Sequence, residues 1–187
     1  MAAPIIVGIS GATGAIYGVE TLRVLKELGQ PAHLIISEMG QRTLAIETDS
    51  TIKEIRALAE ETHKINDLGA SVASGSFRAK GMIVAPCSIK TLSGIAHSFS
   101  YNLLIRAADV TLKEGRPLVL MVRETPLHKG HLELMVKAAD IGAVIHPPVP
   151  AFYHQPETIS DLVRQSVGRA LDHMGIEHDI MERWQGG

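Results

Sequence analysis

Short apolar runs alternate with amphipathic helical patterns along most of this 187-residue chain. Apolar runs of strand length predict β-strands at 5–9, 32–36, 81–85, 118–122 and 143–145. Helical periodicity between them predicts helices over 15–28, 40–47, 52–62, 89–98, 103–113, 130–140 and 158–174, whereas 64–80 shows no clear pattern. Continuously apolar strands that alternate with helices are typical of a parallel sheet covered on both faces. We therefore predict a three-layer α/β fold, with a mostly parallel open sheet of the Rossmann-like kind.

Composition limits the class of protein. No repeat or linker interrupts the pattern, so we expect a single domain over residues 1–187. A net charge of −2 and an aromatic content of 4% argue against nucleic-acid binding. The sequence shows no signal-peptide pattern and no apolar run of membrane-spanning length. Its single cysteine, Cys87, fits a reducing compartment, so we expect a cytoplasmic protein.

Three polar segments each follow a predicted strand, at 8–14, 87–91 and 122–126. Residues just past the carboxyl ends of parallel strands line the ligand crevice of open α/β sheets. These segments are rich in small, hydroxyl and cationic side chains. Their composition favours an anionic nucleotide over an apolar ligand.

The first segment is a glycine turn with Gly8, Gly11 and Gly14, a spacing that differs from G-x-G-x-x-G. A dinucleotide site would place an acidic residue for the ribose at the end of the second strand, where this chain has Ser37 followed by Glu38. The interpretation as a dinucleotide site is therefore weak. A phosphate or a ring at the following helix N-terminus would be favoured by free N–H groups and by the helix dipole. The alternative is a tight turn that needs glycine only for packing.

The other two segments carry charged and hydroxyl side chains. Ser88, Lys90 and Thr91 open a helix, where the hydroxyls either cap that helix or donate to phosphate oxygens. Arg123 and Glu124 end an almost purely apolar strand, which favours a role in a site. The arginine could bind a phosphate through two hydrogen bonds, and the glutamate could act as an acid or a base.

Other ionisable residues leave alternatives open. Arg106 and Lys113 share a helix face, which is either an exposed row of ion pairs or a cationic surface for a phosphate. Arg169 lies beside the buried stripe of the last helix, as a snorkelling arginine does. His128 and His131 lack the H-E-x-x-H spacing, so we predict no metal site, and no aspartate-rich motif for a magnesium diphosphate is present.

Together, these segments resemble the flavin prenyltransferases of the UbiX type, formerly described as aromatic-acid decarboxylase subunits. The resemblance covers roughly residues 5–184. Its strongest pieces are GISGATGAIY at 8–17, Glu47-Thr48-Asp49, ASGSF at 73–77, PCSIKTL at 86–92, RAADVTLKE at 106–114, RPLVLMVRETP at 116–126 and residues 142–156.

The resemblance implies a Rossmann-like fold of the flavoprotein type and an activity. Family members join a dimethylallyl group from dimethylallyl monophosphate to N5 and C6 of reduced FMN, without a metal. The product, prenylated FMN, serves a UbiD-type decarboxylase in ubiquinone biosynthesis or in aromatic-acid degradation. The enzymes are homo-oligomers, usually dodecamers.

The resemblance also implies roles for individual residues. Glu124, Lys113 and Glu47 would be catalytic. Prenyl phosphate would contact Tyr153, Arg169, Lys113 and Glu124, with Arg106 nearby and Trp184 over the pocket, at a subunit contact or merely in a surface tail. FMN would be held by Gly11, Ala12, Thr13, Ser37, Ser88, Ile89, Lys90, Thr91 and Arg123.

Two other functions fit the same resemblance less well. FMN-dependent cysteine decarboxylases carry P-A-S-A-N-T where this chain reads Pro86-Cys87-Ser88-Ile89-Lys90-Thr91. A non-catalytic FMN carrier or assembly subunit would not need a pocket for prenyl phosphate.

Overall fold

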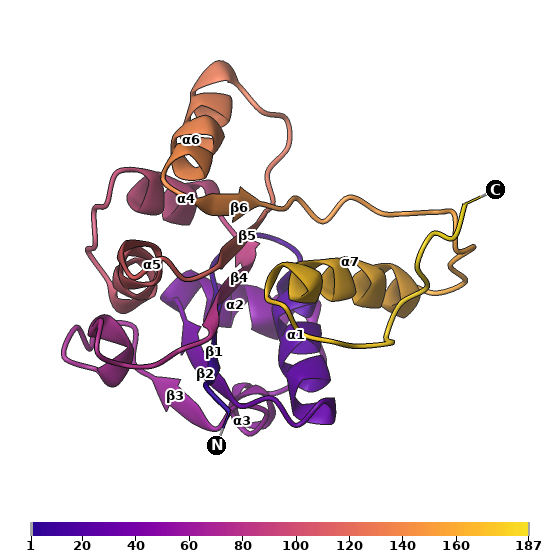
Figure 1. Ribbon diagram of the computed structural model, residues 1–187, viewed down its shortest axis with the longest axis horizontal. Coiled ribbons are helices and arrows are strands. Elements are labelled where there is room, and N and C mark those ends of the chain that lie inside the picture. The colour runs from indigo at the N-terminus through magenta and orange to yellow at the C-terminus, as the bar shows by residue number, and fades with distance from the viewer. Residues whose placement is uncertain (1, 187) are drawn as a thin grey trace.

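The computed structural model describes residues 2–186, which form a six-stranded parallel sheet with helices on both faces (Figure 1). The strand order is β3-β2-β1-β4-β5-β6. β2 and β3 are added on one side of β1, and β4, β5 and β6 are added on its other side. Ligands of open α/β sheets bind where this order reverses, which here is between β1 and β4. The strands are β1 (Ile5–Ile9), β2 (Ala32–Ile36), β3 (Glu61–His63), β4 (Gly81–Cys87), β5 (Leu118–Val122) and β6 (Ala143–Ile145).

The predicted α/β fold is confirmed, with every described strand pair parallel. Alternate residues of β1, β2, β4, β5 and β6 enter two apolar cores, because successive side chains point to opposite faces of a sheet. One core packs against α1 (Ala15–Glu27), α2 (Glu38–Glu47), α3 (Ile52–Arg56) and α7 (Ile159–His173). The other packs against α4 (Ile89–Ala96), α5 (Leu103–Lys113) and α6 (Lys129–Asp140).

The predicted helix over 52–62 is wrong in its second half. Thr51 and Glu54 form a capping box that starts α3, but the helix ends at Arg56. The chain then forms the short edge strand β3, which pairs with β2 in the register His33 to Glu61. β3 has only three residues and all are polar, so the sequence shows no strand period there. Its pairing with β2 in the folded chain makes it a strand. The unassigned stretch 64–80 holds one 3₁₀ turn at Ser71–Ala73.

Buried Ser10 joins the ends of the two strands at the switch point. Its hydroxyl donates a 2.8 Å hydrogen bond to the Pro86 carbonyl and accepts one of 2.8 Å from the Ser88 N–H. The glycine turn after β1 and the start of α4 are therefore held side by side. Among residues 2–186, no helix is both long and apolar enough to cross a bilayer.

Candidate functional site

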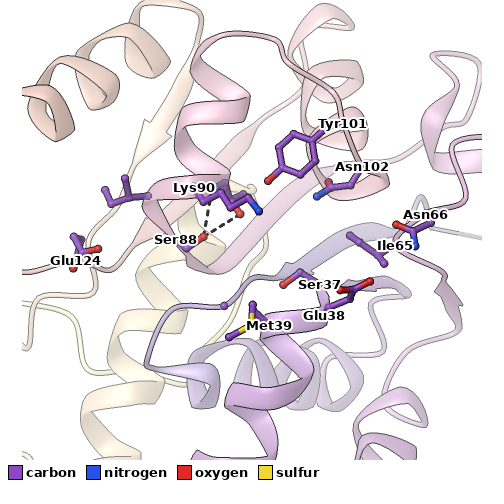
Figure 2. A pocket seen from close by; sticks show the side chains of 13 residues that line it. Ser37, Glu38, Met39, Ile65, Asn66, Ser88, Lys90, Tyr101, Asn102 and Glu124 are labelled. Atoms are coloured by element: carbon purple, nitrogen blue, oxygen red, sulfur yellow. Dashed lines mark hydrogen bonds between the residues drawn. The ribbon is translucent and has the colours of Figure 1, made fainter.

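A crevice lies at the carboxyl ends of β1, β4 and β5 and contains two adjoining cavities of about 460 and 730 Å³. Both cavities are lined by Gly11, Ser88 and Glu124, so they are two parts of one site. Figure 2 shows the first cavity, with Ser37 and Met39 from the start of α2 facing Ser88 and Lys90 at the start of α4. The switch point of the sheet thus carries a polar hollow, as the sequence predicts.

Three helices begin at the first cavity. Ser37, Ser88 and Asn102 are the N-caps of α2, α4 and α5, and each side chain accepts a hydrogen bond from a backbone N–H of its own helix. The positive ends of three helix dipoles therefore converge there. Lys90 also lines this cavity, with its ammonium 5.4 Å from the centre of the Tyr101 ring. This end of the crevice is suited to a phosphate.

Arg123 dominates the second cavity. Its guanidinium lies 5.5 Å from the centre of the Tyr17 ring, and its Nε is buried without a hydrogen-bond partner among residues 2–186. Gly14, at φ 94°, leaves room for it, since a Cβ there would lie 2.6 Å from the Arg123 Cδ. A buried donor normally has a partner, so the unpaired Nε indicates a ligand acceptor in this cavity. The proline run 147–150 also lines this cavity.

Glu47 caps the N-terminus of α1 and does not line either cavity. Its carboxylate accepts hydrogen bonds of 2.8 and 2.9 Å from the backbone N–H groups of Gly14 and Ala15. Burial raises the pKa of Glu47, but hydrogen bonds from Thr13, Ala15 and Gly14 and the charge of Arg123 outweigh it, so the net pKa is lowered. An ionised Glu47 therefore fixes the glycine turn beneath the crevice.

Glu124 stands where the two cavities meet. Its Oε1 accepts a 3.0 Å hydrogen bond from the Thr125 N–H, and the side chain is exposed to the crevice. A carboxylate at this position can reach a ligand in either cavity. All the residues that the resemblance assigned to FMN also line one cavity or the other: Gly11, Ala12, Thr13, Ser37, Ser88, Ile89, Lys90, Thr91 and Arg123.

Arg106 and Lys113 lie outside both cavities. Arg106 pairs with Asp109 at 2.9 Å and donates to the Ala73 carbonyl, while Lys113 pairs with Glu114 instead of Asp109. α5 begins at the crevice and Lys113 is its last residue, about 16 Å away along an axis that rises about 1.5 Å per residue. Lys113 thus lies toward the amino ends of the strands, opposite the crevice.

Tyr153, Arg169 and Trp184 lie together in the C-terminal part of the chain, also outside both cavities. The segment after β6 and the C-terminal tail run beside α7, away from the sheet (Figure 1). The Tyr153 hydroxyl accepts a 2.6 Å hydrogen bond from the Gln165 amide, and its ring contacts the Trp184 ring edge-on at 5.6 Å. Arg169 pairs with Asp172 at 2.7 Å. Within one chain, these three residues therefore do not lie near Glu124.

The sequence analysis did not predict several of the residues that line the crevice. The proline run follows β6 at its carboxyl end and could have been found by the rule that located the other segments. Asn102 carries the signal of an N-cap before a strong helix. Ile65 comes from the stretch without a pattern, so nothing in the sequence marked it. The lining residues missed were Tyr17, Glu38, Met39, Ile65, Asn66, Tyr101, Asn102, Pro147, Pro148, Val149 and Pro150.

Comparison with known proteins identifies the family of this chain. A family model described as Flavoprotein matches residues 2–169. The flavin prenyltransferase UbiX of Escherichia coli K12 is 57% identical over 185 residues, which are 97% of this chain and 98% of the relative. This chain belongs to the UbiX family of flavin prenyltransferases. The UbiX of Thauera aromatica is also 57% identical, over 97% of this chain and 94% of the relative.

Solved structures of UbiX proteins have the same fold. AnUbiX (PadA1), crystallised with FMN and dimethylallyl pyrophosphate, gives a TM-score of 0.98 at 49% identity, with 100% of both chains covered. A dodecameric FMN-dependent UbiX-like decarboxylase from Escherichia coli O157:H7 gives 0.95 at 47% identity, covering 98% of this chain and 100% of that one. The cysteine decarboxylase TvaF, at 14% identity and a TM-score of 0.67, shares the fold alone.

Proposed function

We propose that this protein is a flavin prenyltransferase that joins a dimethylallyl group to N5 and C6 of reduced FMN. The observation that carries the proposal is the crevice, in which three helix N-termini and the unpaired Arg123 donor converge on one hollow among the described residues. Membership of the UbiX family supports the same activity, because close relatives are flavin prenyltransferases.

The residues present fit FMN. The first cavity would hold the flavin phosphate, between the hydroxyls of Ser37, Ser88 and Thr91 and the ammonium of Lys90. The second would hold the ring system, where the buried Arg123 Nε can donate to a flavin acceptor. Reduced FMN supplies the nucleophilic atoms N5 and C6. A crevice with one phosphate site favours FMN over FAD.

The residues that the resemblance assigns to the prenyl phosphate, other than Glu124, lie outside both cavities of the described chain. Breaking the prenyl C–O bond concentrates charge on the phosphate, which Lys113, Arg169 and Tyr153 would stabilise, with Arg106 nearby. Because these residues lie on α5, on α7 and in the segment before α7, outside both cavities, neighbouring copies would have to supply them. A relative of 47% identity is a dodecamer, which supports a homo-oligomer of this kind.

Glu124 is the residue that we propose moves the proton. It lies between the two cavities, within reach of both a flavin and a prenyl chain. Ring closure at C6 releases a proton, and either Glu124 or the departing phosphate would accept it. Glu47 would act indirectly, by holding the turn of Gly14 and Ala15 that faces Arg123.

We further propose that residues 1–187 act as one domain in the cytoplasm and pass prenylated FMN to a UbiD-type decarboxylase. Neither the cysteine decarboxylase nor the carrier alternative is favoured. The cysteine decarboxylases TvaF and SpaF match at only 14% and 13% identity, whereas relatives of 48% and 57% identity are prenyltransferases.

The test is an anaerobic incubation of the purified protein with reduced FMN and either dimethylallyl monophosphate or dimethylallyl pyrophosphate, with EDTA present. Mass spectrometry should find flavin that is heavier by one dimethylallyl unit, with the monophosphate as the better donor. Flavin of unchanged mass with both donors would leave the carrier function instead. Loss of activity in EDTA, restored by magnesium, would contradict a metal-free reaction.

A further inference from the structure

We propose that His33, Glu61 and His63 form a binding site for a divalent transition-metal ion of the Zn²⁺ class, which fastens the edge strand β3 to β2. The cluster lies apart from the crevice and plays no part in prenyl transfer. Its ligand atoms lie within 4.8 Å of one another among the described residues.

The strand register gathers the three side chains on one face of the sheet. His33 of β2 is directly opposite Glu61 of β3, and His63 follows Glu61 by two residues. Because side chains alternate between the faces of a strand, Glu61 and His63 point to the same side as His33. The two histidines are thirty residues apart in sequence, so only the pairing of β3 with β2 reveals the cluster.

The distances suit a shared ion. His33 Nδ1 and His63 Nε2 are 2.9 Å apart, whereas two ligands bound to a tetrahedral ion at about 2.1 Å are about 3.4 Å apart, so the two rings would move apart by about 0.5 Å to share an ion. A Glu61 carboxylate oxygen lies 3.7 Å from His33 Nδ1. The other lies 3.6 Å from His63 Nδ1, the ring nitrogen that does not face His33, so Glu61 has to turn to bind the same ion as His63 Nε2. Glu61 is 55% exposed, so its side chain is free to close the remaining distance.

The surroundings also resemble a metal site. The side chains of His33 and His63 are only 9% and 5% exposed, and Phe77 packs on the His33 ring with centroids 5.1 Å apart. The Phe77 loop is fixed in turn, because Arg116 donates to the carbonyls of Phe77 and Gly75. Two buried imidazoles and one accessible carboxylate leave a solvent-facing position, through which an ion can enter and a water can complete four-coordination.

Two imidazoles and a carboxylate select among ions. Nitrogen ligands suit Zn²⁺, Co²⁺ and Ni²⁺, whereas Mg²⁺ and Ca²⁺ prefer oxygen ligands.

A bound ion would affect the fold only near β3. β3 has only three residues, and the chain after it reaches Ile65 and Asn66, which line the first cavity. An ion shared by β2 and β3 would therefore secure that wall of the crevice.

The competing explanation is a metal-free hydrogen bond in which one imidazole donates to the other. Zinc binding to EDTA-treated, dialysed full-length protein distinguishes the two, measured by competition with a chromogenic zinc indicator. Three variants probe the ligands, namely His33→Asn, His63→Gln and Glu61→Gln. The amides keep a polar atom near the imidazole nitrogen used, and Glu61→Gln changes an exposed residue that should not affect folding. His131→Gln, on α6, is the matched control.

We expect one Zn²⁺ per chain in the wild type and in the control. Each histidine variant should lose at least about tenfold in affinity, and Glu61→Gln should lose less than either. Co²⁺ should give a visible absorption band that the histidine variants lack. Absence of saturable binding in the wild type would overturn the proposal, as would wild-type affinity in both histidine variants. Far-UV circular dichroism checks the fold of each variant.

Discussion

The carboxylate of Glu47 accepts a 2.8 Å hydrogen bond from the backbone N–H of Gly14, where α1 begins. Gly14 is the N-cap of α1 and has no side chain with which to cap it, so Glu47 supplies the cap from 33 residues away. This N-terminus therefore already holds an anion. We expect the flavin phosphate to bind at the starts of α2 and α4 instead.

Replacing Glu47 should loosen the glycine turn. In Glu47→Gln the side chain keeps one acceptor but loses the charge that favours the positive end of α1. A negative charge at a helix N-terminus typically stabilises by about 0.3–1 kcal/mol, so the free energy of unfolding should decrease by an amount in that range. Urea unfolding measures it, with Asp49→Asn in the loop after α2 as the control. An unchanged unfolding free energy would show that the charge of Glu47 does not stabilise the turn.

Removing the charge of Glu124 should slow chemistry but not flavin binding. Glu124→Gln keeps the size and the hydrogen-bonding capacity of the side chain. If Glu124 transfers the proton, prenylation should slow by about 10²-fold or more. Anaerobic single-turnover flavin spectra measure the rate, and Glu38→Gln, a second exposed carboxylate at the crevice, is the control. A near-normal rate for Glu124→Gln would leave the departing phosphate as the base.

Arg169 and Arg183 both pair with Asp172, yet only Arg169 is proposed to bind substrate. Arg169→Ala should therefore raise KM for the prenyl phosphate by about 10- to 100-fold, because it removes a charge-assisted contact. Arg183→Ala removes a surface ion pair and should change KM by less than about threefold. Equal effects of the two variants on KM would indicate that both act only by holding the tail. Tyr153→Phe should fall between them.

Mixed oligomers test whether the site is shared between copies. Lys113→Ala and Glu124→Gln should each be nearly inactive alone. If Lys113 and Glu124 of one site come from different chains, co-expression should restore about a quarter of the wild-type activity, because random assembly pairs two intact residues at that frequency. Affinity tags on each variant isolate the mixed particles. Mixed particles no more active than the two variants alone would place both residues in one chain.

The C-terminal tail should detach at low pH. Burial raises the pKa of Asp172, but its hydrogen bond and ion pair with Arg183, and the charges of His178 and Arg169, lower it overall. A carboxyl with a lowered folded pKa stabilises the docked tail above its ordinary pKa of about 3.9, and this stability is lost as pH falls through the lowered value. Fluorescence of Trp184, which contacts Tyr153, should report the change.

Two variants control the pH experiment. Asp172→Asn should show the detached signal of Trp184 already at neutral pH and no acid transition. Asp179→Asn, in the same tail, should keep the wild-type transition. A transition that survives in Asp172→Asn would assign it to another group.

The sequence alone determined five of the six strands and the segments that line the crevice. Five strands are mainly apolar runs, and the residues just after them must meet on one side of a parallel sheet, at the carboxyl ends of the strands. Ser37, Ser88 and Arg123 are therefore grouped by the pattern of strands and the segments that follow them. Local order along the chain is enough for this, because each residue lies within a few positions of its strand end.

Tertiary structure decided the contacts between segments far apart in sequence. Strand β3 is too short to show a period, so its pairing with β2, and with it the meeting of His33 and His63, appears only in the fold. The cap of α1 by Glu47 likewise depends on how α2 packs beside α1. Arg169 and Lys113 lie away from Glu124 because α5 and α7 carry them to other parts of the fold, a separation that sequence spacing along a helix does not encode.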